Sequence, residues 1–156
     1  DEMFLDEAVD QFSKAYQKRY LNKTIPYEGI LKLLGTLEEK GIKIAVNSNK
    51  RGDYTNALVN KYFSQFSWIA VYGEREREGI PKKPDPSAAL EIANHMNLPA
   101  EEVLYIGDSK TDMETGQNAK MDTIGVAWGF RGAEELRENN ATYIVEKLEA
   151  ILEYVI

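Results

Sequence analysis

The sequence predicts an α/β fold, built on a mainly parallel β-sheet with helices on both of its faces. Short apolar runs, each long enough for one buried strand, alternate along the chain with amphipathic segments of helical length. Strands joined by helices run parallel, because the helix carries the chain back to the edge where the first strand started. With 156 residues, of which 43% are hydrophobic, the chain is long enough to bury one sizeable core.

The first predicted element is an amphipathic helix that ends near Leu21. Apolar and aromatic residues recur at every fourth position: Phe4, Ala8, Phe12, Tyr16 and Tyr20. This spacing places them on one face of a helix, and we interpret that face as a packing surface. Pro26 interrupts the helical pattern in the linker that follows, so we divide the chain into a helical segment, 1–24, and an α/β core, 25–156.

From residue 28 onward, predicted helices and strands alternate to the end of the chain. The helices share an apolar face and cover residues 28–40, 53–63, 87–96, 112–119, 132–139 and the stretch after 146. The strands are short apolar runs at residues 42–46, 67–72, 103–106, 123–127 and 142–145. Gly41 supplies the C-terminal stop of the first of these helices. Residues 74–78 alternate Glu with Arg, which indicates a solvated loop.

Polar residues follow the predicted strands at their carboxyl ends. Ser48, Asn49 and Lys50 come soon after the first strand, and Asp108 follows the third, with Asp112 one helical turn later. Parallel sheets bind ligands at the carboxyl ends of their strands. We therefore expect these side chains to meet at one edge of the sheet.

These residue types suit the binding of a phosphoryl group and a divalent metal. Asp108 and Asp112 could supply the oxygen ligands that Mg2+ prefers, and Ser48 could donate its hydroxyl to a phosphoryl oxygen. Lys83 could neutralise developing charge. Each residue also has a structural interpretation. Helix caps could be formed by Ser48 or Asn49 and by Asp108 or Ser109, Asp112 could favour a helix dipole, and Lys83 could be a surface lysine. Polar groups of this kind occur at three successive sites along the chain, around Ser48, Lys83 and Asp108, and two of these sites follow strands. This order favours the functional interpretation.

Bulk composition excludes several other classes of function. The net charge of -7 makes nucleic acid an unfavourable general partner, because like charges repel. The absence of cysteine excludes disulfides, thiolate metal sites and a cysteine nucleophile, and it agrees with a cytoplasmic location. No apolar run in the sequence approaches the ~20 residues that span a bilayer, so we predict no membrane partner.

The order of the polar motifs resembles the haloacid dehalogenase superfamily. Residues 46–50 (VNSNK), 83–86 (KPDP) and 106–112 (IGDSKTD) are similar to its second, third and fourth motifs, and residues 128–131 (WGFR) are similar to its phosphoglycolate phosphatase branch. The resemblance implies a Rossmann-like core, and it implies that residues 1–24 are the remnant of a helical cap inserted before that core.

The resemblance also implies roles for the polar residues. Ser48 would bind a phosphoryl oxygen, with Asn49 contributing to phosphate binding, and Lys83 would pair with the charges of phosphate and nucleophile. Asp108 would be the Mg2+ ligand, supported by Asp112. The implied activity is Mg2+-dependent hydrolysis of a small phosphorylated metabolite, and the similarity to the phosphoglycolate phosphatase branch implies phosphoglycolate as the substrate.

The sequence departs from the family at its first motif, an Asp-x-Asp at the end of the first strand. Asp6 and Asp10 lie on the predicted helix instead, so we assign no nucleophile. In the family, that strand lies between those that end near Ser48 and Asp108, so we expect the nucleophile upstream. The 156-residue chain alone would then lack turnover and show either a gap in its sheet or a partner chain that fills it. Smaller departures put Gly116 and Lys120 where the family commonly has alanine and glycine, which makes the helix there and its exit loop less certain.

Other functions remain open from the sequence. A phosphomutase or a dehalogenase would keep the fold and change the reaction, and a dehalogenase would need no metal. A receiver-type signalling domain uses similar residues, but its phospho-accepting aspartate would precede the hydroxyl and the lysine. A non-catalytic domain that binds phosphate or a partner protein is the remaining alternative.

Overall fold

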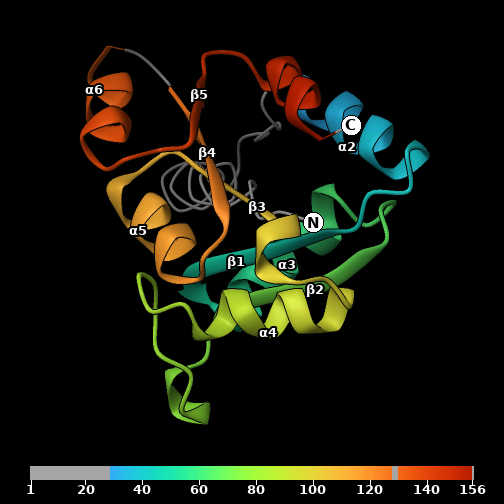
Figure 1. Cartoon of the computed structure of the whole chain (residues 1–156). Coiled ribbons are helices and arrows are strands. Elements are labelled where there is room, and N and C mark those ends of the chain that lie inside the picture. Colours follow the sequence, from blue (N-terminus) through green and yellow to red (C-terminus); the bar gives the residue numbers. More distant parts are fainter. Residues whose placement is uncertain (1–28, 128–129, 156) are drawn as a thin grey trace, which may run out of the picture.

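A computed structural model describes residues 29–127 and 130–155 of the chain. Its elements alternate as the sequence predicts (Figure 1). The helices are α2 (Ile30–Glu39), α3 (Gly52–Tyr62), α4 (Ser87–Met96), α5 (Lys110–Asn118) and α6 (Phe130–Glu138), with 3-10 helices η1 (Glu76–Glu78), η2 (Ala100–Glu102) and η3 (Leu148–Tyr154). The strands are β1 (Ile44–Arg51), β2 (Trp68–Glu74), β3 (Leu104–Gly107), β4 (Asp122–Val126) and β5 (Tyr143–Val145).

The predicted first helix and the predicted boundary after residue 24 lie outside the described residues. The helix predicted after residue 146 is the 3-10 helix η3. In the part of the chain that the structure describes, no helix combines the length and the apolar character needed to cross a membrane.

Every strand pair in the structure is parallel, which confirms the predicted fold class. β1 pairs with β2, placing Val46 opposite Val71. β4 lies between β3 and β5, with Ile106 of β3 opposite Ile124. The parallel arrangement follows from the helices that connect successive strands, since each returns the chain to the same edge.

The first strand is longer than the sequence predicts. An apolar run that stops at Val46 predicted a strand ending there, but β1 continues to Arg51, which pairs with Glu74 after an irregular register beyond Asn47. Backbone pairing with β2 does not depend on apolar side chains, so the polar residues continue the strand. This extension places Ser48 and Asn49 on a strand.

The backbone ladder is interrupted between β1 and β3. The described strands form one sheet of β1 and β2 and a second of β3, β4 and β5, with no ladder between them. Each facing edge carries backbone donors and acceptors that a further strand could pair. The interruption lies where the sequence predicted a gap in the sheet.

Side chains nevertheless pack continuously across this interruption. One hydrophobic cluster contains Val46 of β1 together with Ile106 of β3, both fully buried. A second cluster on the other side contains Ala45 and Tyr105 of the same two strands. Alternate residues of a strand point to opposite faces, so both faces of each sheet contribute to the core. The two sheets therefore share their packing although their backbones do not pair.

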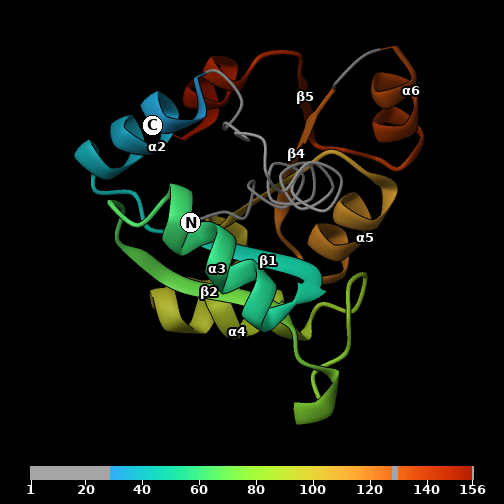
Figure 2. The same cartoon turned by 180° about the vertical axis from the view of Figure 1, so that it is seen from behind.

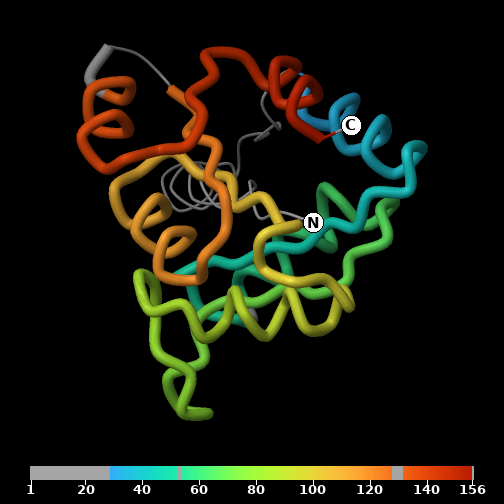
Figure 3. Tube along the Cα trace, viewed as in Figure 1, coloured from blue at the N-terminus to red at the C-terminus, as the bar shows by residue number. Residues whose placement is uncertain are grey.

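The helices cover both faces of the strands. α3 and α4 lie on opposite sides of β1 and β2, as the two opposite views show (Figures 1 and 2). α5 packs against β3 and β4, and α2 lies beside η3 near the C-terminus. The segment between β2 and α4, which includes Lys83, projects from the body and returns to it (Figure 3).

The two small departures from the family pattern have structural consequences. Lys120 follows α5 in the left-handed backbone region, with φ of 63°, and the hydrogen bond from Met121 N to the Gly116 carbonyl oxygen (2.9 Å) closes the helix end. Asn97 occupies the left-handed region after α4, and Gly41 does so after α2. These three helix ends thus require the same conformation, which costs a residue with a Cβ atom more than glycine.

Gly116 lets α5 approach the sheet closely. A Cβ atom at this position would overlap the methyl group of Thr123 and come to 3.1 Å from the Cβ of Tyr105. Both neighbours are fully buried, so neither can move aside without disturbing the core. The alanine that is common in the family would therefore not fit here.

Replacement of Lys120 by glycine is expected to stabilise the protein. Glycine adopts the left-handed conformation without the Cβ penalty, so the free energy of unfolding should rise by about 1 kcal/mol. Urea denaturation of the wild type and Lys120→Gly measures the change. Lys120→Ala is the control, because it removes the charge and keeps the Cβ atom; an equal gain in both variants would contradict the explanation.

Candidate functional site

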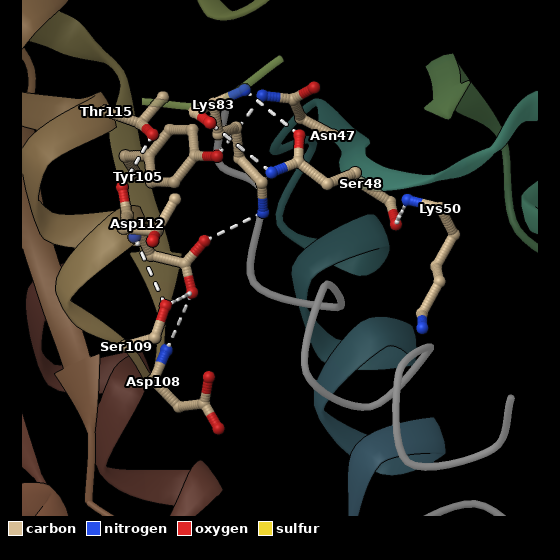
Figure 4. Close-up of polar contacts among 11 residues, drawn as sticks. Asn47, Ser48, Lys50, Lys83, Tyr105, Asp108, Ser109, Asp112 and Thr115 are labelled. Carbon is tan, nitrogen blue, oxygen red and sulfur yellow. Dashed lines mark hydrogen bonds and ion pairs between the residues drawn. The ribbon is translucent and has the colours of Figure 1, made fainter. Parts of the chain in front are cut away.

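The predicted site residues gather at one edge of the fold, where β1 and β3 end (Figure 4). They come from β1, from the segment before α4, and from the end of β3 and the first turn of α5: Ser48, Asn49, Lys83, Asp108 and Asp112. Hydrogen bonds connect Asn49 to Lys83, Lys83 to Asp112, and Asp112 to Asp108. Ser48 lies at the same edge, because it directly precedes Asn49 in the chain.

A buried ion pair between Lys83 and Asp112 lies at the centre of this cluster. Lys83 Nζ is 2.9 Å from Asp112 Oδ1, and the two side chains are only 4% and 2% exposed. The other carboxylate oxygen, Oδ2, accepts hydrogen bonds from Asp108 N (3.1 Å) and from the Ser109 hydroxyl (3.0 Å). Both oxygens are engaged, which offsets the cost of removing the charge from water.

Local sequence explains why Asp112 takes this position. Ser109 caps α5 by accepting a hydrogen bond from Asp112 N (3.3 Å), so the structural interpretation as a cap applies to Ser109. Gly107 leaves room for the Asp112 side chain, because a Cβ atom on residue 107 would overlap it. The short strand end and the first helical turn thus fold the carboxylate back towards β3.

Asn49 holds the main chain of Lys83. Its Oδ1 accepts a hydrogen bond from Lys83 N at 3.0 Å, and its Nδ2 donates to the Lys83 carbonyl oxygen at 3.4 Å. On the next residue, the Pro84 carbonyl oxygen accepts a hydrogen bond from Asn118 Nδ2 at 2.9 Å. The segment that carries Lys83 is therefore attached to both β1 and α5.

The start of this segment is also anchored. The Arg75 guanidinium lies 3.7 Å from the centre of the Tyr72 ring, and its Nη2 is 2.6 Å from Glu91 Oε2. The hydrogen bond from Arg75 lowers the pKa of Glu91 from its ordinary value, so this carboxylate stays ionised beside the guanidinium. The contacts tie the segment to β2 and to α4.

Ser48 is almost fully buried, at 2% exposure. Its Oγ accepts a hydrogen bond from Lys50 N at 3.0 Å. A hydroxyl group can accept and donate at once, so this contact is compatible with donation of its own hydrogen to a phosphoryl oxygen. The predicted role of Ser48 in phosphate binding stays a prediction.

Asp108 is half-buried, and its carboxylate points away from the Lys83–Asp112 pair (Figure 4). Within the described residues, no group of three or more His, Asp or Glu side chains could hold a metal ion. Mg2+ is commonly held by one or two carboxylates plus phosphate and water, so Asp108 fits as one ligand of such a site. Asp112 contacts Lys83 and Asp108, and its predicted supporting role in metal binding stays a prediction.

A hydrogen bond that the sequence analysis missed joins the two sheets beneath the site. Asn47 Nδ2 donates to the Tyr105 hydroxyl at 3.2 Å, and both residues are buried. Burial, together with the nearby Asp112 charge, raises the pKa of Tyr105 well above its usual value, so the phenol stays neutral. Two features of the sequence could have indicated this contact: Asn47 is a polar residue directly after an apolar run, and Tyr105 lies within an apolar strand.

The Asn47–Tyr105 contact should appear as a coupling energy. Tyr105→Phe or Asn47→Val alone removes one partner of this buried hydrogen bond, which costs about 1–3 kcal/mol. Replacing both partners should cost less than the sum, because the first change already breaks the hydrogen bond. Chemical denaturation of the two single variants and the double variant measures the coupling, and strictly additive losses would show that the contact has no energetic role.

Comparison with known proteins places the chain among hydrolases. Residues 1–126 match the haloacid dehalogenase-like hydrolase family. A phosphoglycolate phosphatase of Psychrobacter arcticus is 31% identical over 154 residues, which are 97% of this chain and 65% of that protein. A phosphoglycolate phosphatase of Pseudomonas syringae pv. tomato is 25% identical over 97% of this chain and 55% of its own length. The chain thus spans less than two-thirds of the length of these relatives.

Solved structures support the same fold. A crystal structure of a candidate phosphoglycolate phosphatase from Lactobacillus delbrueckii subsp. bulgaricus superposes with a TM-score of 0.80 and 36% identity, covering 95% of this chain and 61% of that one. A candidate β-phosphoglucomutase from Thermotoga maritima gives a TM-score of 0.77 at 19% identity, covering 92% of this chain and 65% of that one. At 19% identity, the second likeness shows the fold alone.

Proposed function

Because the chain belongs to the haloacid dehalogenase-like hydrolase family, we propose that the complete protein is a Mg2+-dependent phosphomonoester hydrolase. The observation that carries the proposal is the buried Lys83–Asp112 pair at an edge shared with Ser48 and Asp108. A lysine held in this way provides a fixed positive charge for a phosphate, and phosphoryl transfer is catalysed mainly by positioning and charge stabilisation.

The described side chains divide the work of binding and charge stabilisation. Lys83 neutralises negative charge on the phosphoryl oxygens, while Asp112 holds its ammonium group in place. Ser48 donates a hydrogen bond to a phosphoryl oxygen, and the backbone amides at the start of α3 favour the anion. Asn49 lies beside them, and phosphate binding is the role predicted for it from the sequence.

Asp108 is the residue proposed to hold Mg2+. Its half-buried carboxylate at the end of β3 is an oxygen ligand of the kind that Mg2+ prefers. Asp112 supports it indirectly, since its carboxylate fixes the main chain of Asp108. When bound, Mg2+ neutralises charge on the transferring phosphoryl group.

The nucleophile is proposed to be an aspartate on a strand that pairs with both β1 and β3. The facing edges of the two sheets support this placement, because buried backbone groups without partners are costly. The carboxylate would attack phosphorus and form an aspartyl-phosphate, as the ester oxygen leaves and takes a proton from a general acid. Water would then hydrolyse the aspartyl-phosphate, and without this carboxylate the site would not turn over.

The proposed substrate is a small phosphorylated metabolite, with phosphoglycolate as the best candidate. The names of the two relatives support this choice, and the chain is 31% identical to the first of them. The net charge of -7 argues against nucleic acid as the substrate. A cytoplasmic location agrees with the absence of cysteine from the sequence.

Asp108→Asn in the complete gene product is expected to abolish most phosphatase activity. The variant loses the charge of the proposed metal ligand, so kcat should fall by about 100-fold or more. Phosphate release from phosphoglycolate and a panel of small phosphomonoesters, with Mg2+ and with EDTA, measures the effect.

The matched control is Asp122→Asn, because Asp122 is exposed at the opposite end of the same sheet. This variant should retain wild-type activity. Full activity in Asp108→Asn would refute the metal assignment. Phosphate release that is unchanged in EDTA would instead refute the proposed Mg2+ requirement.

A further inference from the structure

We propose that Asn49 is a positioning residue for Lys83, acting on the lysine main chain. This inference rests on the proposed function, in which Lys83 stabilises the phosphoryl charge. It differs from the sequence-based prediction, which gave Asn49 a role in binding phosphate. The carboxamide faces the peptide group of Lys83 in the structure, with one hydrogen bond to its N–H and one to its carbonyl oxygen.

The chemistry of the asparagine side chain matches this task. A carboxamide carries one acceptor oxygen and one donor nitrogen, as a peptide group does, so it can pair with both main-chain groups of a single residue. Oδ1 accepts from Lys83 N at 3.0 Å and Nδ2 donates to the Lys83 oxygen at 3.4 Å. Alanine could make neither bond, and an ionised aspartate lacks a donor for the Lys83 carbonyl oxygen.

We call the two hydrogen bonds between the Asn49 side chain and the Lys83 main chain the clamp. The clamp holds the main chain of Lys83, whereas the ion pair holds only its ammonium group. Asp112 holds the ammonium group at 2.9 Å, while the main chain of Lys83 lies in a segment outside any helix or strand. A lysine side chain loses up to about 2 kcal/mol of rotamer entropy when it is ordered, so a site that uses a lysine benefits from fixing it in advance. Asn49 attaches that main chain to β1, the strand that also carries Ser48.

Direct contact with phosphate is the competing role for Asn49. Nδ2 has two hydrogens, and one of them serves the Lys83 carbonyl oxygen, so the second could reach an anion. The two roles differ in kinetics. A positioning residue acts only through Lys83, so its loss has no effect when Lys83 is absent, whereas a phosphate contact changes the affinity for phosphate whether or not Lys83 is present.

The test compares Asn49→Ala, Lys83→Ala and the double variant of the complete gene product. The measured quantities are kcat and KM for p-nitrophenyl phosphate and the inhibition constant of inorganic phosphate. We expect Asn49→Ala to lower kcat by about 10- to 100-fold and to raise the inhibition constant no further than Lys83→Ala does. In the Lys83→Ala background, Asn49→Ala should have no further effect on kcat.

Asn60→Ala is the control, because Asn60 is exposed on α3. It should behave as the wild type in every assay. A weaker affinity for inorganic phosphate with unchanged kcat in Asn49→Ala would overturn the proposal, as would losses of kcat that multiply in the double variant.

Hydrogen exchange separates failure of the clamp from failure of the proposed function. Lys83 N donates to Asn49, so its amide should exchange faster in Asn49→Ala than in the wild type, whatever reaction the protein catalyses. An unchanged exchange rate would overturn the clamp. Full turnover in Lys83→Ala, by contrast, would refute the proposed function. The exchange rate of the Lys83 amide would still test the clamp in that case.

Discussion

A lysine and an aspartate that are both excluded from water must stay together, because removing either one leaves an unpaired buried charge. Lys83 and Asp112 are in this position, with side chains exposed by 4% and 2%. Their pair connects the segment before α4 to the first turn of α5, and through Asp108 N it reaches the end of β3. Asn49 contacts the main chain of Lys83, and the Asp108 N–H and the Ser109 hydroxyl contact Asp112, so these polar residues connect to the two charges.

Side-chain contacts replace a backbone ladder at the centre of the fold. β1 and β3 carry the two halves of the site, and the described residues form no ladder between them. The Asn47–Tyr105 hydrogen bond, the shared hydrophobic clusters and the ion pair span the interval instead. Together these contacts hold the strand that carries Ser48 beside the strand that ends before Asp108. A strand placed between β1 and β3 would satisfy the facing edges and carry its own end residue to the same place.

The sequence was most informative where a pattern repeats along the chain. Apolar spacing predicted the order of helices and strands, because the same spacing that forms an element also buries it. The gathering of Ser48 and Asp108 at one edge followed from the rule for parallel strands. The place of Lys83 beside them followed from the family resemblance, and the gap in the sheet followed from the family motif that the sequence lacks. The chemical roles of these residues stay predictions, because geometry alone does not show a reaction.

Pairwise contacts between distant residues could not be predicted in the same way. Asp112 was predicted from the sequence as a supporting metal ligand, and nothing in the local pattern indicates that its carboxylate would contact a lysine 29 positions away. Tyr105 looked like a residue of an apolar strand until its hydroxyl was placed beside Asn47. Lys120 is the reverse case. The family pattern, which commonly has glycine here, singled out the position, but only the structure gave the reason, a backbone φ of 63°.

The measurement that tests this account most directly is the energetic coupling between Lys83 and Asp112 in the complete gene product. Lys83→Met and Asp112→Asn, alone and together, would be compared with the wild type by denaturant unfolding. Each single change should cost about 3–5 kcal/mol, and the double variant should cost clearly less than their sum, since it leaves no buried charge without a partner. Single losses below about 1 kcal/mol, the value typical of an exposed pair, would contradict the central role given to this contact.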